Sequence, residues 1–465
     1  MKTSNELKYI DIADRLELFV DDYLVAAMNG TTRRLHTPCR MPRPQNPLTG
    51  AYITVIKDGD IFRAYARHMK PGSDLIKDGN SNECTCYFES RDGIEWESPD
   101  LDIIAPEQCG GMRNVIINEP PFAHNFSPFL DTHPEVNPDE RFKALAGLHG
   151  SGLFAFASAD GLHWRKMQDT PVIRYQPEIH GPWAFDSQNV AFYCAIEQKY
   201  VAFFRHMKGP QEPLRAIGRA TSTDFLKWHD ESATFQPPNL PGEHLYTNQT
   251  HPYFRAPHLY LALPTRFALG MVQGQAIEGN LGSTDILLMT LRPGNNHYDR
   301  LFKEAFIRPG PHPENWDSRA NYTALNVVPT QPTEISIYNR DGHRYVIRTD
   351  GFASIHAAFE KGEMLTRPLI FCGDTLTLNI STSVIGSVQV ELQSRDGSPI
   401  PGFTLADCAP ITGDHIQYPV SWQGGSIGKL AGHPVQLRFV MNEADLYSIQ
   451  FQKTNSTANK PKQEK

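Results

Sequence analysis

Short apolar runs separated by turn-forming residues follow one another through the first 360 or so positions of the chain. Three of these runs lead into variants of one phrase, at residues 89–96 (ESRDGIEW), 157–164 (ASADGLHW) and 221–228 (TSTDFLKW). The closing tryptophans, at positions 96, 164 and 228, are 68 and then 64 residues apart, and a weaker echo ends at Tyr298, 70 residues further on. Self-similarity at a nearly constant spacing predicts a repeat architecture.

Each repeat predicts four short strands. The Asp-Gly pair of the first two phrases is typical of a two-residue hairpin turn between two strands. Two more apolar runs precede the phrase, as at residues 51–56 and 61–66 in the first repeat. Four strands per repeat predict a propeller blade. The alternative, a β-sandwich whose turns match by coincidence, is weaker because the phrase recurs three times in register. The five predicted blades are residues 51–101, 124–167, 185–230, 246–301 and 321–359.

The chain therefore predicts an all-β protein, a five-bladed β-propeller followed by a C-terminal β-sandwich. The propeller domain is expected over residues 1–365, with the segment 1–40, strand-like over 16–25, closing the last blade or packing beneath it. The sandwich is expected over residues 366–452, and the polar tail 453–465 is expected to be disordered. Predicted sandwich strands cover residues 376–380, 387–392, 416–420, 435–440 and 447–451.

Charge and composition exclude several classes of protein. A formal net charge of −8 without a basic stripe disfavours a nucleic acid or an anionic membrane as partner. Residues 1–9 lack the apolar core of a signal peptide, so the protein is expected to be cytoplasmic, or periplasmic or secreted if a leader was removed. The seven cysteines show no paired-ligand spacing, which indicates buried free thiols. No cofactor and no catalytic metal are expected, and the oligomeric state is open.

Segments before the predicted inner strands resemble elements of the five-bladed propeller glycoside hydrolases, families 32, 43 and 68 and their relatives. Residues 185–190 (FDSQNV) are similar to the Arg-Asp-Pro element of family 32, which places Asp186 directly before an inner strand. Asn125 stands at the corresponding acidic position of the second blade, and residues 45–50 (QNPLTG) occupy the position of the family's nucleophile without an Asp. The resemblance spans roughly residues 40–452. It implies catalytic carboxylates at the start of inner strands and an appended sandwich.

Glycosidic cleavage ordinarily requires two carboxyl groups on opposite sides of the scissile bond. Asp186 is the first candidate, as base or nucleophile. Glu83 and Asp285 open third strands at the same face of their blades and are the candidates for the acid, with strand-end capping or a salt bridge as the alternative for each. Some propeller relatives use a histidine as the acid, so His124, His206 or His251 is a further option.

A polar pocket is predicted at the mouth of the channel, because second strands return to the face from which inner strands begin. Arg319 is expected to receive an anionic substituent such as sulfate or carboxylate, and Trp183, Tyr246 and Trp316 to stack on a sugar ring. The remaining candidate substrate-binding residues are Arg67, His68, His124, Asn125, Gln188, Arg205, His206, Asn248, His251 and Arg266.

The leading hypothesis is an exo-acting glycoside hydrolase that releases a terminal sugar from a plant or algal oligosaccharide by carboxylate acid/base catalysis. Its partner is the end of an oligosaccharide or polysaccharide chain. Two alternatives stay open: a glycoside phosphorylase, in which the Arg-His pairs hold phosphate, and a carbohydrate-binding propeller without catalysis.

Overall fold

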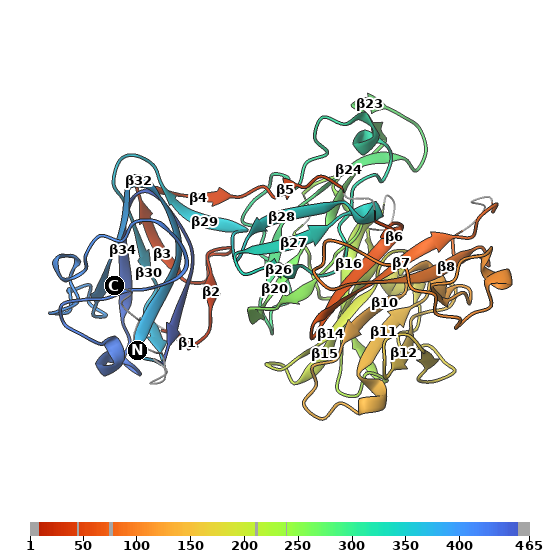
Figure 1. The fold of residues 1–465 in the computed structure, drawn as a ribbon, viewed down its shortest axis with the longest axis horizontal. Helices are drawn as coiled ribbons and strands as arrows, with labels where there is room; N and C mark the ends of the chain where they lie inside the picture. Colours follow the sequence, from red (N-terminus) through yellow and green to blue (C-terminus); the bar gives the residue numbers. More distant parts are fainter. Residues whose placement is uncertain (1–8, 44–45, 74–77, 210–212, 239, 454–465) are drawn as a thin grey trace, which may run out of the picture. The chain divides into compact units, whose positions relative to one another are not determined.

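A computed structural model of the chain describes residues 9–43, 46–73, 78–209, 213–238 and 240–453 (Figure 1). The chain forms two compact units. One is Thr37–Ile347, and the other combines the residues up to His36 with those from Arg348 onwards. Strands dominate both units, and no helix of the described part is long and apolar enough to cross a membrane.

The unit Thr37–Ile347 is the five-bladed propeller that the repeats predict, and each of its first three blades is an antiparallel sheet of four consecutive strands (Figure 1). The first blade contains β6 (Ala51–Asp58), β7 (Ile61–Met69), β8 (Glu83–Ser90) and β9 (Val115–Ile117). The second contains β10 (Ser127–Leu130), β11 (Phe142–Ala146), β12 (Phe154–Ser158) and β13 (Arg165–Lys166). The third contains β14 (Val190–Cys194), β15 (Lys199–Lys208), β16 (Leu214–Ser222) and β17 (Trp228–Asp230).

The fourth and fifth blades are less regular. The fourth combines β19 (His251–Tyr253), β20 (Ala256–Ala262) and β25 (Met289–Leu291) with a second small sheet of β18 (His244–Leu245), β21 (Thr265–Leu269) and β24 (Gly282–Ile286). The fifth contains β26 (Val328–Gln331), β27 (Glu334–Tyr338) and β28 (Arg344–Arg348), and takes β5 (Cys39–Arg40) as its fourth strand.

The predicted end of the propeller at residue 365 differs from the structure. The fifth blade ends with β28, which pairs with β5. Strand β29 (Ala353–Ala357), predicted inside that blade, pairs instead with β4 (Thr31–Leu35) and β34 (Gln436–Gln452) in the other unit. Because β5 already covers the edge of β28, the ring needs no further strand there. Residues 16–25 are therefore not the strand that closes the last blade.

The repeated phrase forms a longer connection than the predicted two-residue turn. Strand β12 ends at Ser158 and β13 begins at Arg165. Between them the Asp160 carboxylate accepts hydrogen bonds from the backbone N–H of Leu162 and His163, at 2.8 and 2.9 Å. Asp92 and Asp224 accept the equivalent pairs of bonds in the other two copies. The carboxylate, rather than a tight hairpin, shapes the turn.

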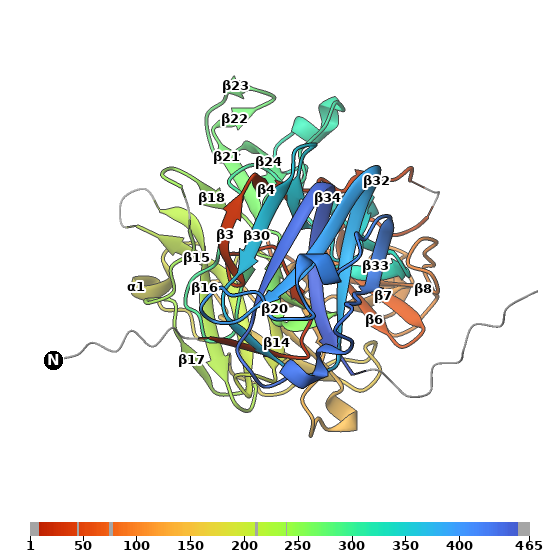
Figure 2. The ribbon, with the colours of Figure 1, turned by 90° about the vertical axis from the view of Figure 1, so that its left-hand side faces the viewer.

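The other unit is the β-sandwich, and two of its strands are longer than predicted (Figure 2). Strands β32 (Thr375–Gln393) and β34 each include two predicted strands, because β32 continues across an irregularity between Thr382 and Ser387. Its other strands include β1 (Ile10–Ala13), β2 (Glu17–Leu18), β3 (Val25–Asn29), β30 (Gly362–Thr366), β31 (Leu369–Phe371) and β33 (Asp414–Pro419). Residues 454–465, most of the predicted disordered tail, lie outside the described residues.

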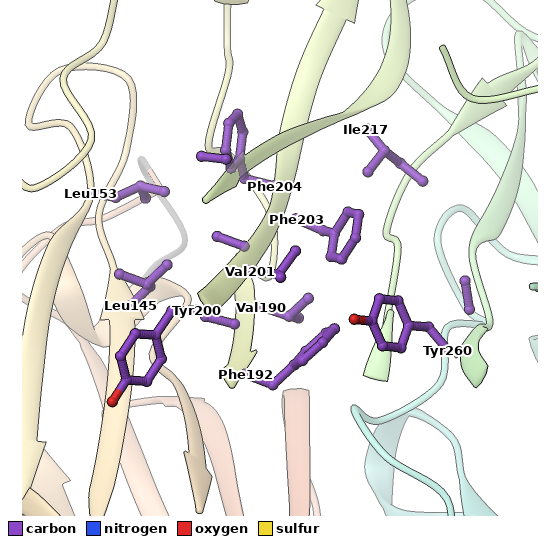
Figure 3. Close-up of a cluster of buried hydrophobic side chains, with 14 of the residues drawn as sticks. Leu145, Leu153, Val190, Phe192, Tyr200, Val201, Phe203, Phe204, Ile217 and Tyr260 are labelled. Atoms are coloured by element: carbon purple, nitrogen blue, oxygen red, sulfur yellow. The ribbon is translucent and has the colours of Figure 1, made fainter. Parts of the chain in front are cut away.

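Aromatic and aliphatic side chains fill the space between neighbouring blades (Figure 3). Phe192 and Phe203 of the third blade pack towards Tyr260 of the fourth, with the Phe192 and Tyr260 ring centroids 4.8 Å apart. Burial of one such side chain contributes about 1.5–3 kcal/mol. This packing gives the strand ends around the centre of the propeller fixed relative positions.

Candidate active site

A pocket of about 650 Å³ lies where loops of the first, third and fourth blades meet. Its polar lining residues are Asp78, Asp186, Arg205, Arg215, His244 and Asn280. Trp183, Met207, Pro213, Leu214 and Leu269 supply most of the apolar wall. A concave site with an apolar wall and a few converging charged groups is typical of a small-molecule or sugar pocket.

The backbone on either side of Asp186 is fixed by two buried carboxamides. Asn125 donates to the carbonyl oxygens of Phe185 and Ser187, at 2.8 and 2.9 Å. Asn189 donates to the same two oxygens, both at 3.0 Å. Asp186 therefore lies between two anchored neighbours, directly before the inner strand β14, as the sequence predicts.

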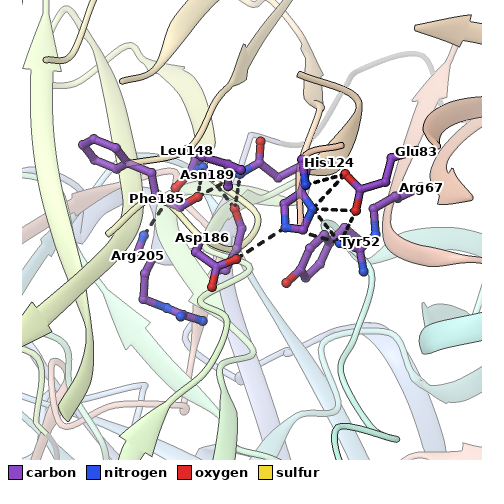
Figure 4. Close-up of polar contacts among 12 residues, drawn as sticks. Tyr52, Arg67, Glu83, His124, Leu148, Phe185, Asp186, Asn189 and Arg205 are labelled. Carbon is purple, nitrogen blue, oxygen red and sulfur yellow. Dashed lines mark hydrogen bonds and ion pairs between the residues drawn. The ribbon is translucent and has the colours of Figure 1, made fainter. Parts of the chain in front are cut away.

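A chain of ionisable groups leads from the interior to the pocket (Figure 4). The His124 ring is buried, and its Nδ1 lies 2.9 Å from Oε1 of Glu83. Its Nε2 lies 3.4 Å from Oδ1 of Asp186. The side chain of Glu83 is only 1% exposed, whereas that of Asp186 is 29% exposed. Glu83 thus does not face the pocket, although it reaches Asp186 through the imidazole.

The two carboxylates raise the pKa of His124. Burial and the charge of Arg67 act to lower the pKa of His124, but hydrogen bonds to Asp186 and Glu83 outweigh them and raise it. Burial acts to raise the pKa of Asp186, but the hydrogen bond from His124 and the charge of Arg205 give it a net decrease. The charged form of His124 is thus favoured between the two carboxylates, although Nη1 of Arg67 also lies 2.9 Å from its Nδ1, and Asp186 is ionised at the pocket.

Asp78 is a second carboxylate at this site, and sequence reasoning missed it. Asp78, His124 and Asp186 each offer one donor atom, and these atoms all lie within 4.8 Å of one another. Asp78 is exposed and lies in the connection between β7 and β8, next to Gly79, whose N–H donates to Glu83 at 2.8 Å. A metal ion would require a neutral imidazole as ligand. The neighbouring carboxylates raise the pKa of His124, which acts against the neutral ring that a metal ion would need.

Two arginines also line the pocket. Arg205 is 3% exposed, donates to the carbonyl oxygen of Tyr246 and lies over the Tyr246 ring, with its guanidinium carbon 4.9 Å from the centroid. Arg215 donates through Nη2 to Oδ1 of Asn280 at 2.6 Å, and its backbone N–H donates to Nδ1 of His244 at 3.1 Å. Burial and the charges of Arg215 and Arg205 lower the pKa of His244 to about 4, so His244 is neutral.

Several predicted substrate-binding residues instead form a buried network across the channel. Gln188 donates to Oγ1 of Thr54 at 2.8 Å, and Gln249 donates to Oε1 of Gln188 at 2.6 Å and to the carbonyl oxygen of Thr323 at 2.7 Å. Asn248 is 2% exposed and donates to the carbonyl oxygens of Gln188 and Phe203. This network joins the first, third, fourth and fifth blades two residues beyond Asp186, and Gln188 and Gln249 are fully buried in it.

Two histidines that were predicted to bind substrate instead form hydrogen bonds to backbone groups of the propeller. His251 Nδ1 donates to the carbonyl oxygen of Gln249 at 2.8 Å, and its Nε2 accepts from the N–H of Val327 at 3.2 Å. Burial lowers the pKa of His251 to about 4, in agreement with a neutral ring. His68 donates from Nε2 to the carbonyl oxygen of Thr49 at 2.9 Å.

Other predicted residues lie near the pocket without lining it. Both oxygens of Asp285 accept from Arg266, at 2.9 and 2.5 Å, so the structure does not bring Asp285 to Asp186. His206 is half-buried, and burial lowers its pKa to about 4. Trp316 donates to the carbonyl oxygen of Gly310 at 2.9 Å. Arg319 donates to the carbonyl oxygen of Asn280 and is therefore adjacent to the lining.

Of the predicted set, Trp183, Asp186 and Arg205 line the pocket, and Glu83, His124, Asn125 and Arg67 lie behind it. Tyr246 lies beneath Arg205, and its hydroxyl is 3.3 Å from that of Tyr52. Arg215 was also missed, although one signal was available. It occupies the second position of the third strand β16, and third strands begin at the face of the pocket.

No protein-family model matches the chain, and no curated protein matches it by sequence. Solved structures similar to it include a family 43 arabinoxylan arabinofuranohydrolase from Bacillus subtilis, at 12% identity over 87% of this chain and 96% of that one, with a TM-score of 0.40. A Bombyx mori family 32 β-fructofuranosidase shows 10% identity over 91% and 95% of the two chains, with a TM-score of 0.42.

A structure from the GH130 family of mannoside phosphorylases, which contains glycoside hydrolases for β-1,2 mannosidic linkages, shows 11% identity over 69% and 94%, with a TM-score of 0.40. At these identities the similarity is one of fold. The chemistry of the site is therefore derived from its own geometry.

Proposed function

We propose that the protein is a glycoside hydrolase, in which Asp186 and Asp78 act on a glycosidic bond in the pocket. One observation carries the proposal: Asp186, beside the buried His124 ring and with a lowered pKa, shares a pocket of about 650 Å³ with a second carboxyl group, that of Asp78. Paired carboxyl groups in different environments are what acid and base roles in glycoside hydrolysis require.

The roles follow from the surroundings of each group. Asp186 remains charged and suits attack on the anomeric carbon, because His124 lowers its pKa. Asp78 is exposed on its loop and is the group placed to give a proton to the leaving oxygen. Donor atoms within 4.8 Å correspond to the short separation, about 5 Å, of retaining enzymes. In the second step, Asp78 removes a proton from the water that releases the sugar from Asp186.

Glu83, predicted as the acid, acts in this proposal as a positioning residue. Its oxygens accept from Gly79 N–H and from His124, and neither faces the pocket. Its charge raises the pKa of His124, and His124 in turn lowers the pKa of Asp186 and fixes its orientation.

The pocket favours the end of a glycan chain over its middle. Gln188 and Gln249 are fully buried behind Asp186, so in this proposal a bound chain ends at the pocket. Removal of a terminal sugar, an exo mode of action, is the mode that suits such a pocket.

The test is turnover of plant and algal oligosaccharides with a reducing-sugar readout. We expect Asp186→Asn and Asp78→Asn to lower kcat by more than about a thousandfold with substrate binding retained. Asp60→Asn, which removes an exposed carboxylate from the turn between β6 and β7, is the matched control and should be fully active. A wild-type protein that binds glycans but cleaves none would contradict the proposal and favour a carbohydrate-binding propeller.

Phosphorolysis is a second candidate, favoured by Arg205 and Arg215, whose guanidinium groups suit a phosphate in place of the attacking water. Under this alternative, turnover requires inorganic phosphate and releases a sugar phosphate. Hydrolysis at an undiminished rate in phosphate-free buffer would exclude it.

A further inference from the structure

Three guanidinium groups gather on two aromatic rings beside the pocket. Arg205 lies over Tyr246, with its guanidinium carbon 4.9 Å from the ring centroid, and Arg215 lies over Phe267 at the same distance. Arg319 lies between them, 5.7 Å from the Tyr246 centroid and 5.2 Å from that of Phe267. Aromatic faces stabilise these cations and hold their planes in place.

This cluster concentrates positive charge in a poorly solvated place. Arg205 is 3% and Arg215 is 8% exposed. Burial, together with the charges of Arg205 and Arg319, lowers the pKa of Arg215 to about 10. Within the described ranges, no ion pair joins Arg205 or Arg319 to a carboxylate, and Nε of Arg205 is buried without a hydrogen-bond partner. Like charges held together in this way are stabilised by a bound anion.

We infer that the sugar taken by this pocket carries an anionic group, a carboxylate or a sulfate ester, which Arg205 and Arg215 bind with Arg319 beside them. The inference rests on the proposed function, because it assigns the substrate class of the same pocket. Guanidinium groups present several N–H donors in one plane, which suits the oxygens of either anion. Neutral His244 accepts from the Arg215 backbone and adds no charge of its own.

The simplest alternative is that the arginines only neutralise Asp186 and Asp78. Arg205 does act on Asp186, since its charge is one of the causes of the lowered pKa of that carboxyl. However, Arg215 turns its Nη2 to Asn280 and gathers with Arg319 on Phe267, so the positive charge extends beyond the two acids. The two explanations differ in one measurable property, the preference for a charged over a neutral sugar.

The test compares binding of glucuronic acid, galacturonic acid and the 6-sulfates of glucose and galactose with binding of glucose and galactose, by NMR titration at fixed ionic strength. We expect at least one anionic sugar to bind about tenfold or more tightly than its neutral parent. The uronic acid and sulfate arms show which anion is preferred. Arg215→Gln and Arg319→Gln should each reduce the preference, and Arg91→Gln, an exposed arginine on the first blade, should leave it unchanged.

Three results would overturn the inference: no anionic sugar binds more tightly than its parent, the preference survives in both arginine variants, or turnover of neutral glycans depends on phosphate. Arg319 is half-buried at the surface, so its variant should fold even if Arg215→Gln does not. Asp186→Asn should keep the preference without turnover. If the wild type prefers anionic sugars but cleaves no glycan, the proposed hydrolysis is wrong and the anion preference stands. If it cleaves only neutral glycans, the anion preference is wrong and the proposed hydrolysis stands.

Discussion

The two carboxamides that flank Asp186 should show strong energetic coupling. Asn125→Ala leaves the N–H and the C=O of Gly147 without the partners they have in the structure, at 3.0 and 2.8 Å. Each buried group left unpaired costs about 1–3 kcal/mol, so we expect a loss of about 2–6 kcal/mol in the free energy of unfolding. Asn189→Ala alone should cost less, because Asn125 still donates to Phe185 and Ser187.

The carbonyl oxygens of Phe185 and Ser187 lose both of their carboxamide donors only when Asn125→Ala and Asn189→Ala are combined. The destabilisation of this double variant should therefore exceed the sum of the two single values by about 1–3 kcal/mol. Urea unfolding followed by tryptophan fluorescence measures this, since five of the six tryptophans lie within the propeller unit. Asn295→Ala, an exposed asparagine, is the matched control and should leave stability unchanged. Additive losses, or a loss below about 1 kcal/mol for Asn125→Ala, would refute this account of how Asp186 is held.

Two further predictions concern pH. Glu83→Gln removes a charge that raises the pKa of His124, so His124 should lose its proton at lower pH. The pKa of Asp186 should then rise, and the acidic limb of the plot of kcat against pH should move to higher pH. An unmoved limb would contradict the influence of Glu83 on Asp186 through His124. His206, His244 and His251 have pKa values lowered to about 4, so they stay neutral in the folded protein while the unfolded chain binds protons below about pH 6.5. The stability they contribute is complete above pH 6.5 and is lost as the pH falls towards 4. His251→Gln should make the urea midpoint less dependent on pH in this window, and an unchanged dependence would be evidence against a buried neutral ring.

The repeated phrase was sufficient to predict the blades, because its turn chemistry and its tryptophan depend on local residues. The edge that closes the ring was not predictable in the same way. Pairing of β5 with β28 and of β29 with β4 is decided by which distant edges are free, and strand composition does not record that.

The candidate site was predictable where strand ends decide it. Asp186 and Arg205 follow from the rule that inner strands begin and second strands end at one face. Asp78 lies in an irregular connection with no period to place it. The sequence predicted that three polar side chains bind substrate, those of Asn125, Gln188 and Asn248. In the structure they instead form hydrogen bonds with buried groups of neighbouring strands and blades. Strands that meet at the centre of the propeller need such partners for their buried polar groups.

The pairing of β4 with β29 gives the chain an unusual order of assembly. Leu35 lies opposite Ala353, and the N–H of His36 donates to the carbonyl oxygen of Phe352 at 3.0 Å, so the two strands form a hairpin whose loop is the entire propeller. During synthesis, the first strands of the sandwich must wait unpaired until more than three hundred further residues have left the ribosome. A short turn in place of Thr37–Ile347 would join these neighbouring strands directly, which offers a route to the sandwich as a separate protein.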